Sequence, residues 1–155
     1  MLRDVAALSR ICRNQSSAKA NISKTAILYA WVALGSVLGG LARYLISLLI
    51  LPASGFPLAT LFVNVTGSFI IGFYGTLSGP DGRWFASAQQ RQFVMTGFCG
   101  GYTTFSSFSL ETVRLLQAGQ ARTALLNIAV SVVTWLLAVW LGYAAASRLN
   151  RLKGS

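Results

Sequence analysis

Residues 97–111 read GFCGGYTTFSSFSLE and lie inside an apolar segment long enough to cross a membrane. Paired glycines followed by two threonines make a poor continuous helix, because both residue types disfavour helical backbone. We therefore expect the helix to break here. Unwound backbone at membrane depth must be buried or line a cavity, where its carbonyl groups can bind a cation such as Na⁺.

The second half of this stretch offers groups that a small anion could contact. Phe105 and Phe108 are three residues apart and share a helical face, and aromatic rings have electropositive edges. Hydroxyl groups lie nearby on Ser106, Ser107, Ser109 and Thr112. A path of ring edges and hydroxyls could pass an anion without trapping it, which is the balance that conduction needs.

Working outward, four apolar segments are each long enough to span a bilayer, which takes roughly 20 residues. They cover residues 26–51, 56–77, 93–116 and 124–146, with turns at 52–55, 78–82 and 118–120. Such short connections force neighbouring helices to run antiparallel. The sequence therefore predicts an all-α membrane protein with four transmembrane helices, the third of them broken.

The composition of the 155 residues agrees, because 54% are hydrophobic and only 10% are charged. Soluble domains carry about 25% charged residues, so a water-soluble globule is excluded. The sequence has no His, no Walker-type glycine loop and no pair of carboxylates suited to acid–base chemistry, and we do not expect an enzyme. The two cysteines, with no His beside them, support neither a disulfide framework nor a zinc site.

Residues 1–25 differ in kind, because they are basic, rich in Ser and Asn, and contain no sustained apolar run. This composition predicts a disordered N-terminal extension, which could be a cytoplasmic tail, an organelle transit peptide or the product of an over-extended start. The membrane domain is expected at residues 26–148 and a basic C-terminal tail at 149–155.

The formal net charge of +10 suggests a membrane topology more than nucleic-acid binding. Basic residues gather in loops that stay cytoplasmic, and the side holding both termini has seven near the spans against two on the other side. The seven are Lys19, Lys24, Arg83, Arg91, Arg148, Arg151 and Lys153, and the two are Arg114 and Arg122. We expect a multi-pass protein of the cell inner membrane with both termini in the cytoplasm.

Three polar residues lie inside the predicted spans, where a polar or charged side chain is costly unless it faces protein or water. Arg43 either reaches the headgroups from a shortened first span or forms an electropositive vestibule for anions. Asn64 either holds helices together or donates its amide N–H to an anion. Glu111 is the only acidic residue within a span, and it suits either a rim position with a structural partner or a proton relay. Gly35 and Gly39 form a GxxxG pattern that predicts close helix packing.

These residues together resemble a known family, the CrcB/Fluc fluoride channels. The resemblance rests on GGLARY at residues 39–44, LFVNVTGSF at 61–69 and residues 97–109. It implies a passive, selective channel that exports fluoride from the cytoplasm and protects against fluoride toxicity. It also implies an antiparallel, dual-topology dimer in the lipid bilayer with two pores.

The resemblance assigns roles to individual residues. Phe105 and Phe108 would meet fluoride with their ring edges, Asn64 would be the pore amide, and Arg43 would sit at the vestibule. Ser106, Ser109 and Thr112 would continue the polar path with Glu111 close by. The carbonyls of Gly100 and Thr103 would bind a structural Na⁺ at the dimer centre, and polar residues of the fourth span, among Asn127, Ser131 and Thr134, would also contribute.

An antiparallel homodimer requires one chain to insert in both directions, which a bias of seven to two opposes. Without residues 1–25 the bias falls to five against two, so we favour the homodimer over pairing with an oppositely oriented homologue. Two other functions remain to be weighed. A proton-coupled exporter of the small multidrug type would need a carboxylate in the first span, where the sequence has Arg43. A non-transporting membrane subunit would leave Asn64 and the Thr/Ser/Phe run unexplained.

Overall fold

The computed structural model describes the backbone of residues 2–50, 55–79, 82 and 84–151, and the side chains of these residues from residue 21 onward. The elements of the described residues are all helices, with no strand among them. The elements are α1 (Leu2–Leu49), α2 (Leu58–Leu77), α3 (Ala88–Arg91), the π-helical η1 (Gln92–Cys99), α4 (Gly100–Tyr102), α5 (Phe105–Gln117) and α6 (Ala121–Arg151).

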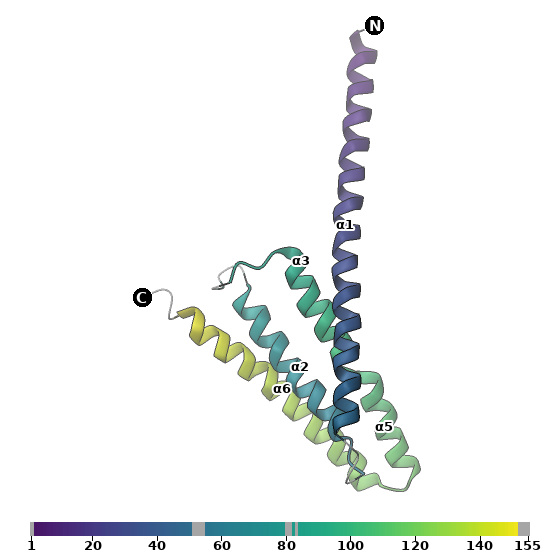
Figure 1. Ribbon diagram of the computed structural model, residues 1–155, viewed down its shortest axis with the longest axis vertical. Coiled ribbons are helices and arrows are strands. Elements are labelled where there is room, and N and C mark those ends of the chain that lie inside the picture. The colour runs from purple at the N-terminus through teal and green to yellow at the C-terminus, as the bar shows by residue number, and fades with distance from the viewer. Residues whose placement is uncertain (1, 51–54, 80–81, 83, 152–155) are drawn as a thin grey trace.

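The helices pack as two pairs (Figure 1). One pair is α1 with the continuous run α3–η1–α4, and the other is α2 with α6. Helix α1 and the segment from α3 to α5 run in one direction, and α2 and α6 run in the opposite direction, so both termini lie toward one end of the bundle. This alternation confirms the antiparallel order that the short connections predict.

Glycines set how closely the helices of each pair approach. A Cβ added at Gly35 would lie 2.5 Å from the Phe93 carbonyl oxygen on η1, and one at Gly97 would lie 2.7 Å from the Val32 oxygen on α1. In the other pair, Gly72 and Gly142 face the backbones of α6 and α2 in the same way. Close backbone approach is how helices associate where lipid gives no hydrophobic gain, so the structure confirms the packing role of the GxxxG glycines.

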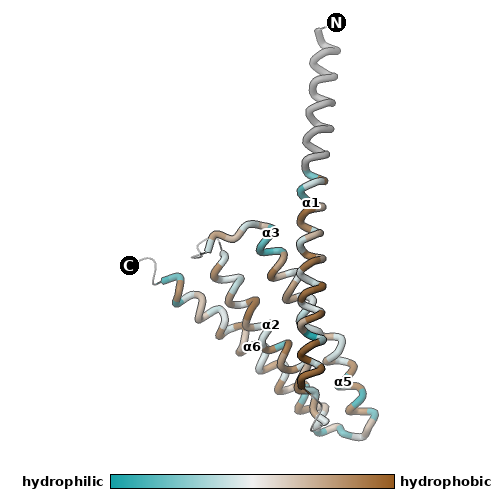
Figure 2. The backbone as a smooth tube through the Cα atoms, in the orientation of Figure 1, coloured by the Kyte–Doolittle hydropathy of each residue, from teal (hydrophilic) through white to brown (hydrophobic). Residues whose placement is uncertain are grey.

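Three of the four predicted spans appear as continuous helices long and apolar enough to cross a membrane, namely Asn21–Leu49, Leu58–Leu77 and Ala121–Arg151. Large apolar side chains are exposed along α1, α2 and α6, and Figure 2 shows the hydrophobic residues that run along these helices. The third predicted span, residues 93–116, is instead divided among η1, α4 and α5. No one of these three elements is long enough to span a bilayer.

The ends of the chain differ from the expectation in one respect. The sequence predicts a disordered extension for residues 1–25, whereas the structure continues α1 back to Leu2. Residues 1–25 contain no Gly or Pro and several good helix formers, so nothing in them stops a helix that has already begun. Helix α6 likewise extends to Arg151, into the predicted tail, while residues 152–155 lie outside the described part.

The predicted turns are described only in part. The turn at residues 118–120 is confirmed, with Gly119 at a φ of 73° that favours glycine. Residues 52–54 of the first turn and residues 80 and 81 of the second lie outside the described residues. Near the second turn, the Arg91 guanidinium on α3 donates a hydrogen bond to the Ser78 carbonyl, which ties the start of the third membrane segment to the end of α2.

Candidate functional site

The helix that begins at α3 is interrupted at Thr103 and Thr104. Both residues have extended backbone, with φ −80° and ψ 158° at Thr103 and φ −151° and ψ 114° at Thr104. The Thr104 hydroxyl accepts a hydrogen bond from the Ser107 N–H at 3.1 Å, so Thr104 caps the N-terminus of α5. Helix α4 therefore ends and α5 begins within two residues.

Asn64 on α2 holds this extended segment by two hydrogen bonds. Its Oδ1 accepts from the Thr104 N–H at 2.7 Å, and its Nδ2 donates to the Thr104 carbonyl at 3.0 Å. Asn64 is 5% exposed, so both bonds are made away from water. An amide nitrogen carries two N–H groups, and one of them is used here, which leaves the second for another acceptor.

The interruption leaves backbone carbonyls without their helical partners, those of Gly100 and Thr103 among them. In a continuous helix the Thr104 N–H would bond the Gly100 carbonyl and the Ser107 N–H would bond the Thr103 carbonyl. Here the Thr104 N–H donates to Asn64 and the Ser107 N–H donates to Thr104 Oγ1. The carbonyls of Gly100 and Thr103 therefore lack their helical partners, and Gly100 lies at the surface with no atom close to the position of a Cβ.

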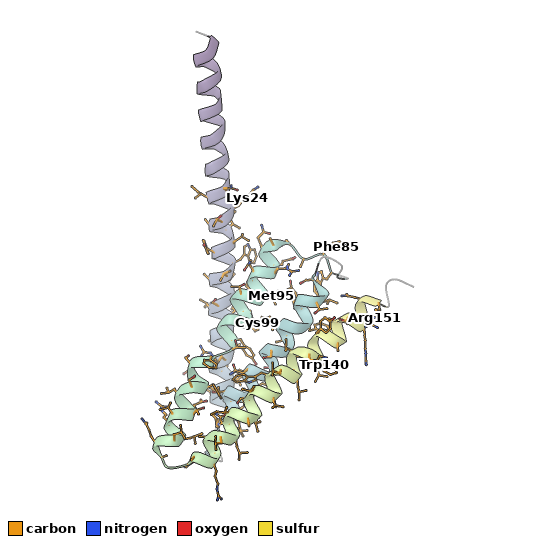
Figure 3. The ribbon with its side chains drawn as sticks, turned by 180° about the vertical axis from the view of Figure 1, so that it is seen from behind. Lys24, Phe85, Met95, Cys99, Trp140 and Arg151 are labelled. Carbon is orange, nitrogen blue, oxygen red and sulfur yellow. The ribbon has the colours of Figure 1, made fainter. Side chains whose placement is uncertain are left out.

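A cavity of about 340 Å³ lies at the interruption, and we call it the break cavity. It brings together Asn64, Gly100, Thr103 and Phe105 among the residues that the sequence predicts for the site. Met95 and Cys99 on η1, both labelled in Figure 3, form another part of its wall. Residues from α2, η1, α4, α5 and α6 thus meet at one place.

The two phenylalanines differ in their surroundings. Phe105 is 71% exposed, whereas Phe108 is 7% exposed and lies between two other rings. The ring centroids of Phe105 and Phe108 are 5.5 Å apart, and Phe108 meets Trp135 of α6 at 5.0 Å with the ring planes at 75°. The structure therefore confirms that Phe105 and Phe108 share a face, and it places an aromatic partner on α6 beside them.

One turn after Phe108 along α5, a row of buried polar groups joins α5 to α6. The Thr112 hydroxyl donates to the Phe108 carbonyl at 2.8 Å and accepts from Asn127 Nδ2 at 2.9 Å. The Ser131 hydroxyl lies 3.4 Å from Asn127 Oδ1. Asn127 and Ser131 are buried, whereas Thr134 donates its hydroxyl to carbonyls of its own helix.

A second cavity, of about 280 Å³, holds Arg43 and Glu111, and we call it the arginine cavity. The Thr60 hydroxyl donates to Glu111 Oε1 at 2.7 Å. Glu111 Oε2 and Arg43 Nε are buried without a hydrogen-bond partner in the described part of the chain. Buried charged groups are costly unless they are paired or hydrogen-bonded, so this cavity suits water or an ion. Thr104 lines both cavities.

Four predicted site residues line neither cavity, namely Phe108, Thr112, Ser106 and Ser109. Ser106 is exposed and its hydroxyl lies 3.2 Å from Thr104 Oγ1, and the Ser109 hydroxyl donates to the Phe105 carbonyl at 2.9 Å.

The structure also places at the site two residues that the sequence does not predict there, Thr60 and Trp135. Ser107, one of the predicted hydroxyl residues, donates its backbone N–H to Thr104 and lines the arginine cavity. Thr60 is four residues before Asn64, and Trp135 is four residues after Ser131. Both spacings put side chains on one helical face, so each residue could have been found from its polar neighbour.

Comparison with known proteins places the chain in a family. The family described as CrcB-like protein, Camphor Resistance (CrcB), matches residues 30–143. The chain belongs to the CrcB family. The match covers all of α2 to α5, most of the apolar part of α1 and most of α6. The residues that line the two cavities therefore lie within the matched region.

Curated relatives in the CrcB family carry the name of an ion channel. The chain is 65% identical to "Fluoride-specific ion channel FluC 1" of Rhodopseudomonas palustris (strain BisB18) over 132 residues, which cover 84% of this chain and 94% of the relative. It is 64% identical to the protein of the same name in Bradyrhizobium diazoefficiens, over 85% of this chain and 93% of the relative. A FluC protein of Methylocella silvestris is 49% identical over 82% of this chain and 98% of the relative.

Proposed function

We propose that this chain forms a passive, fluoride-selective channel that lets fluoride leave the cytoplasm. The observation that carries the proposal is the pair of rings, Phe105 and Phe108, placed next to the break cavity in a chain 65% identical to a protein named as a fluoride-specific ion channel. The relatives' names favour a channel over a proton-coupled exporter or a non-transporting subunit.

The proposed path follows the polar groups described above. Fluoride enters the arginine cavity, where the Arg43 guanidinium attracts it, and passes Thr104, which lines both cavities. The second N–H of Asn64 donates to the ion as it passes. The ring edges of Phe105 and Phe108 then contact the ion, and Thr112, Ser106 and Ser109 supply hydroxyls along α5. Glu111, held by Thr60, lies at the rim of this path.

These groups suit fluoride because each offers modest attraction without a full charge beside the rings. Ring edges carry a partial positive charge, and hydroxyl and amide N–H groups donate single hydrogen bonds. An ion bound by several weak donors can both enter and leave, as conduction requires. The full positive charge of Arg43 lies in the arginine cavity, which neither phenylalanine lines.

We also propose that residues 93–116 cross the membrane as a broken third helix and that two chains pair in antiparallel orientation. The exposed Phe105 and Gly100 would be covered by the second chain. The freed carbonyls of Gly100 and Thr103 fit a hard cation such as Na⁺, since unwound carbonyls are its usual ligands in membrane proteins. One chain offers two of these carbonyls, so a site shared by two chains would give the ion enough oxygen ligands.

Fluoride efflux from liposomes that contain the purified chain tests the function. We expect rapid loss of fluoride, read by a fluoride electrode, with chloride retained and no pH gradient needed. Flux that appears only with a pH gradient would replace the channel by a proton-coupled transporter. No flux from the chain alone, in either condition, would contradict a channel formed by this chain.

A separate measurement tests the cation. The thermal stability of the purified protein is compared in buffers of NaCl and of N-methyl-D-glucamine chloride at equal ionic strength. Because a ligand that binds only the folded state raises its stability, we expect a higher melting temperature in Na⁺. Equal melting temperatures in the two buffers would contradict the Na⁺ site without touching the channel proposal.

A further inference from the structure

Trp135 on α6 carries a buried hydrogen-bond donor that has no partner. Its indole Nε1 is buried and unpaired, as judged among the residues that the structure describes. The indole lines the break cavity, and its ring packs against the ring of Phe108 at 5.0 Å. Buried donors in folded proteins nearly always have an acceptor, so this one calls for an explanation.

Its place on α6 continues the row of buried polar groups. Asn127, Ser131 and Trp135 are spaced four residues apart and so share one helical face. The Asn127 amide donates to Thr112, and the Ser131 hydroxyl lies within hydrogen-bond distance of Asn127. The Ser131 hydroxyl is therefore engaged and Asn127 uses one of its two N–H groups, whereas the single N–H of Trp135, at the cavity end of the row, has no partner among the described residues.

The indole N–H can only donate and cannot accept a hydrogen bond. It therefore gives nothing to a cation and is suited to an acceptor, of which an anion is the strongest. The Asn64 amide, which also lines the break cavity, keeps one N–H unused and can donate it to the same acceptor. The break cavity thus offers an amide N–H from α2 and an indole N–H from α6.

We propose that the Trp135 N–H donates a hydrogen bond to fluoride in the break cavity and is the anion-binding group that α6 contributes to the path. This inference rests on the proposed fluoride channel and names a binding residue within it. Trp135 acts together with Phe108, whose position the indole fixes by ring contact. The role of the phenylalanine pair therefore depends in part on α6.

Substitution separates the donor from the ring. Trp135→Phe keeps an aromatic ring against Phe108 and removes the N–H, and we expect fluoride efflux to slow by about tenfold, which corresponds to about 1.4 kcal/mol. Trp140→Phe is the matched control, because Trp140 lies on the same helix but is 60% exposed (Figure 3). We expect the control to conduct at the rate of the unsubstituted chain. Equal rates in Trp135→Phe and the control would overturn the proposal.

A direct measurement uses the indole N–H signals of the protein labelled with ¹⁵N-tryptophan. The chain has four tryptophans, Trp31, Trp84, Trp135 and Trp140, whose signals are assigned from single Trp→Phe variants. If Trp135→Phe does not fold, the Trp135 signal of the unsubstituted protein is identified as the one that remains after the other three are assigned. We expect NaF, but not NaCl, to shift the Trp135 signal and leave the Trp140 signal in place.

The efflux assay tests the proposed channel, and the Trp135 signal tests the role of the indole, so the two proposals can fail separately. Fluoride efflux by the unsubstituted chain without a fluoride-dependent shift of Trp135 would leave the channel standing and overturn the role of the indole, since water would then be its partner. Absence of efflux from the unsubstituted chain would instead contradict the proposed function. A shift of all four signals together would indicate a general change of the protein and would also count against the proposal.

Discussion

At the scale of single residues, Asn64 shows how one side chain can shape a backbone. Its carbonyl oxygen takes the Thr104 N–H that a continuous helix would give to Gly100. The interruption and the free carbonyl of Gly100 therefore have the same cause. Sequence analysis offers two roles for Asn64, a helix-bridging group and a pore amide, and the geometry gives it the first while leaving one N–H for the second.

Replacing Asn64 by Leu tests the first role. The change removes both bonds to Thr104 and leaves buried backbone groups unpaired, so we expect the free energy of unfolding to fall by about 2–4 kcal/mol. Denaturation of the purified protein in detergent measures it. Gln120→Ala, at an exposed position in the turn after α5, is the control and should change stability little. Equal stability of the two variants would show that the Asn64 bonds do not hold the break.

Phe108→Ile tests the ring edge. Isoleucine keeps an apolar, though smaller, side chain and has no electropositive edge, and we expect fluoride efflux to fall by about tenfold or more. Phe62→Ile, at a 47% exposed position on α2, should conduct at the unsubstituted rate. Size-exclusion chromatography checks that both variants fold. Unchanged flux in a folded Phe108→Ile protein would contradict the role of the ring.

At the scale of elements, glycines bring α1 against η1. The backbone of Phe98 on η1 lies where a Cβ at Gly39 would be, whereas the space beside Gly40 is open for 4 Å. Two neighbouring glycines of one helix thus differ sharply in what they contact. Alanine substitutions at the two positions therefore separate the effect of helix propensity on stability from the effect of helix packing.

We expect Gly39→Ala to lower stability by about 1–3 kcal/mol, because the added methyl group must push α1 and η1 apart. Gly40→Ala should leave stability unchanged or raise it by up to about 1 kcal/mol, since alanine favours a helix. Melting temperatures of the two variants in the same detergent decide the matter. Equal melting temperatures would mean that contact between α1 and η1 does not limit the stability of the bundle.

Sequence analysis predicts the elements better than the contacts between them. Hydropathy locates α1, α2 and α6, and the paired glycines and threonines of residues 97–104 indicate the helix interruption, because these signals are local along the chain. The bonds from Thr60 to Glu111 and from Asn64 to Thr104 join residues 51 and 40 positions apart. No local pattern contains such pairings. The polar row of α6 could be assigned only once α5 was seen beside it.

At the scale of the whole molecule, the direction of insertion decides which assembly can form. Both termini lie at one end of the bundle (Figure 1), and the turn at residues 118–120 lies at the other. An antiparallel pair of identical chains needs both insertions in one membrane. The excess of basic residues on the side of the termini favours one of them, so the homodimer and the charge bias make opposing demands.

A single cysteine in that turn measures the outcome. Gln120→Cys is introduced into a chain in which Cys12 and Cys99 are replaced by Ser, and intact cells are treated with a membrane-impermeant maleimide before and after lysis. We expect about half of the chains to react before lysis, because equal populations of the two orientations are required for an antiparallel homodimer. If all or none react before lysis, the chain has one orientation, and an antiparallel channel would then need an oppositely oriented homologue. Efflux by the purified chain in liposomes cannot replace this assay, since reconstitution can randomise the orientation that the cell imposes.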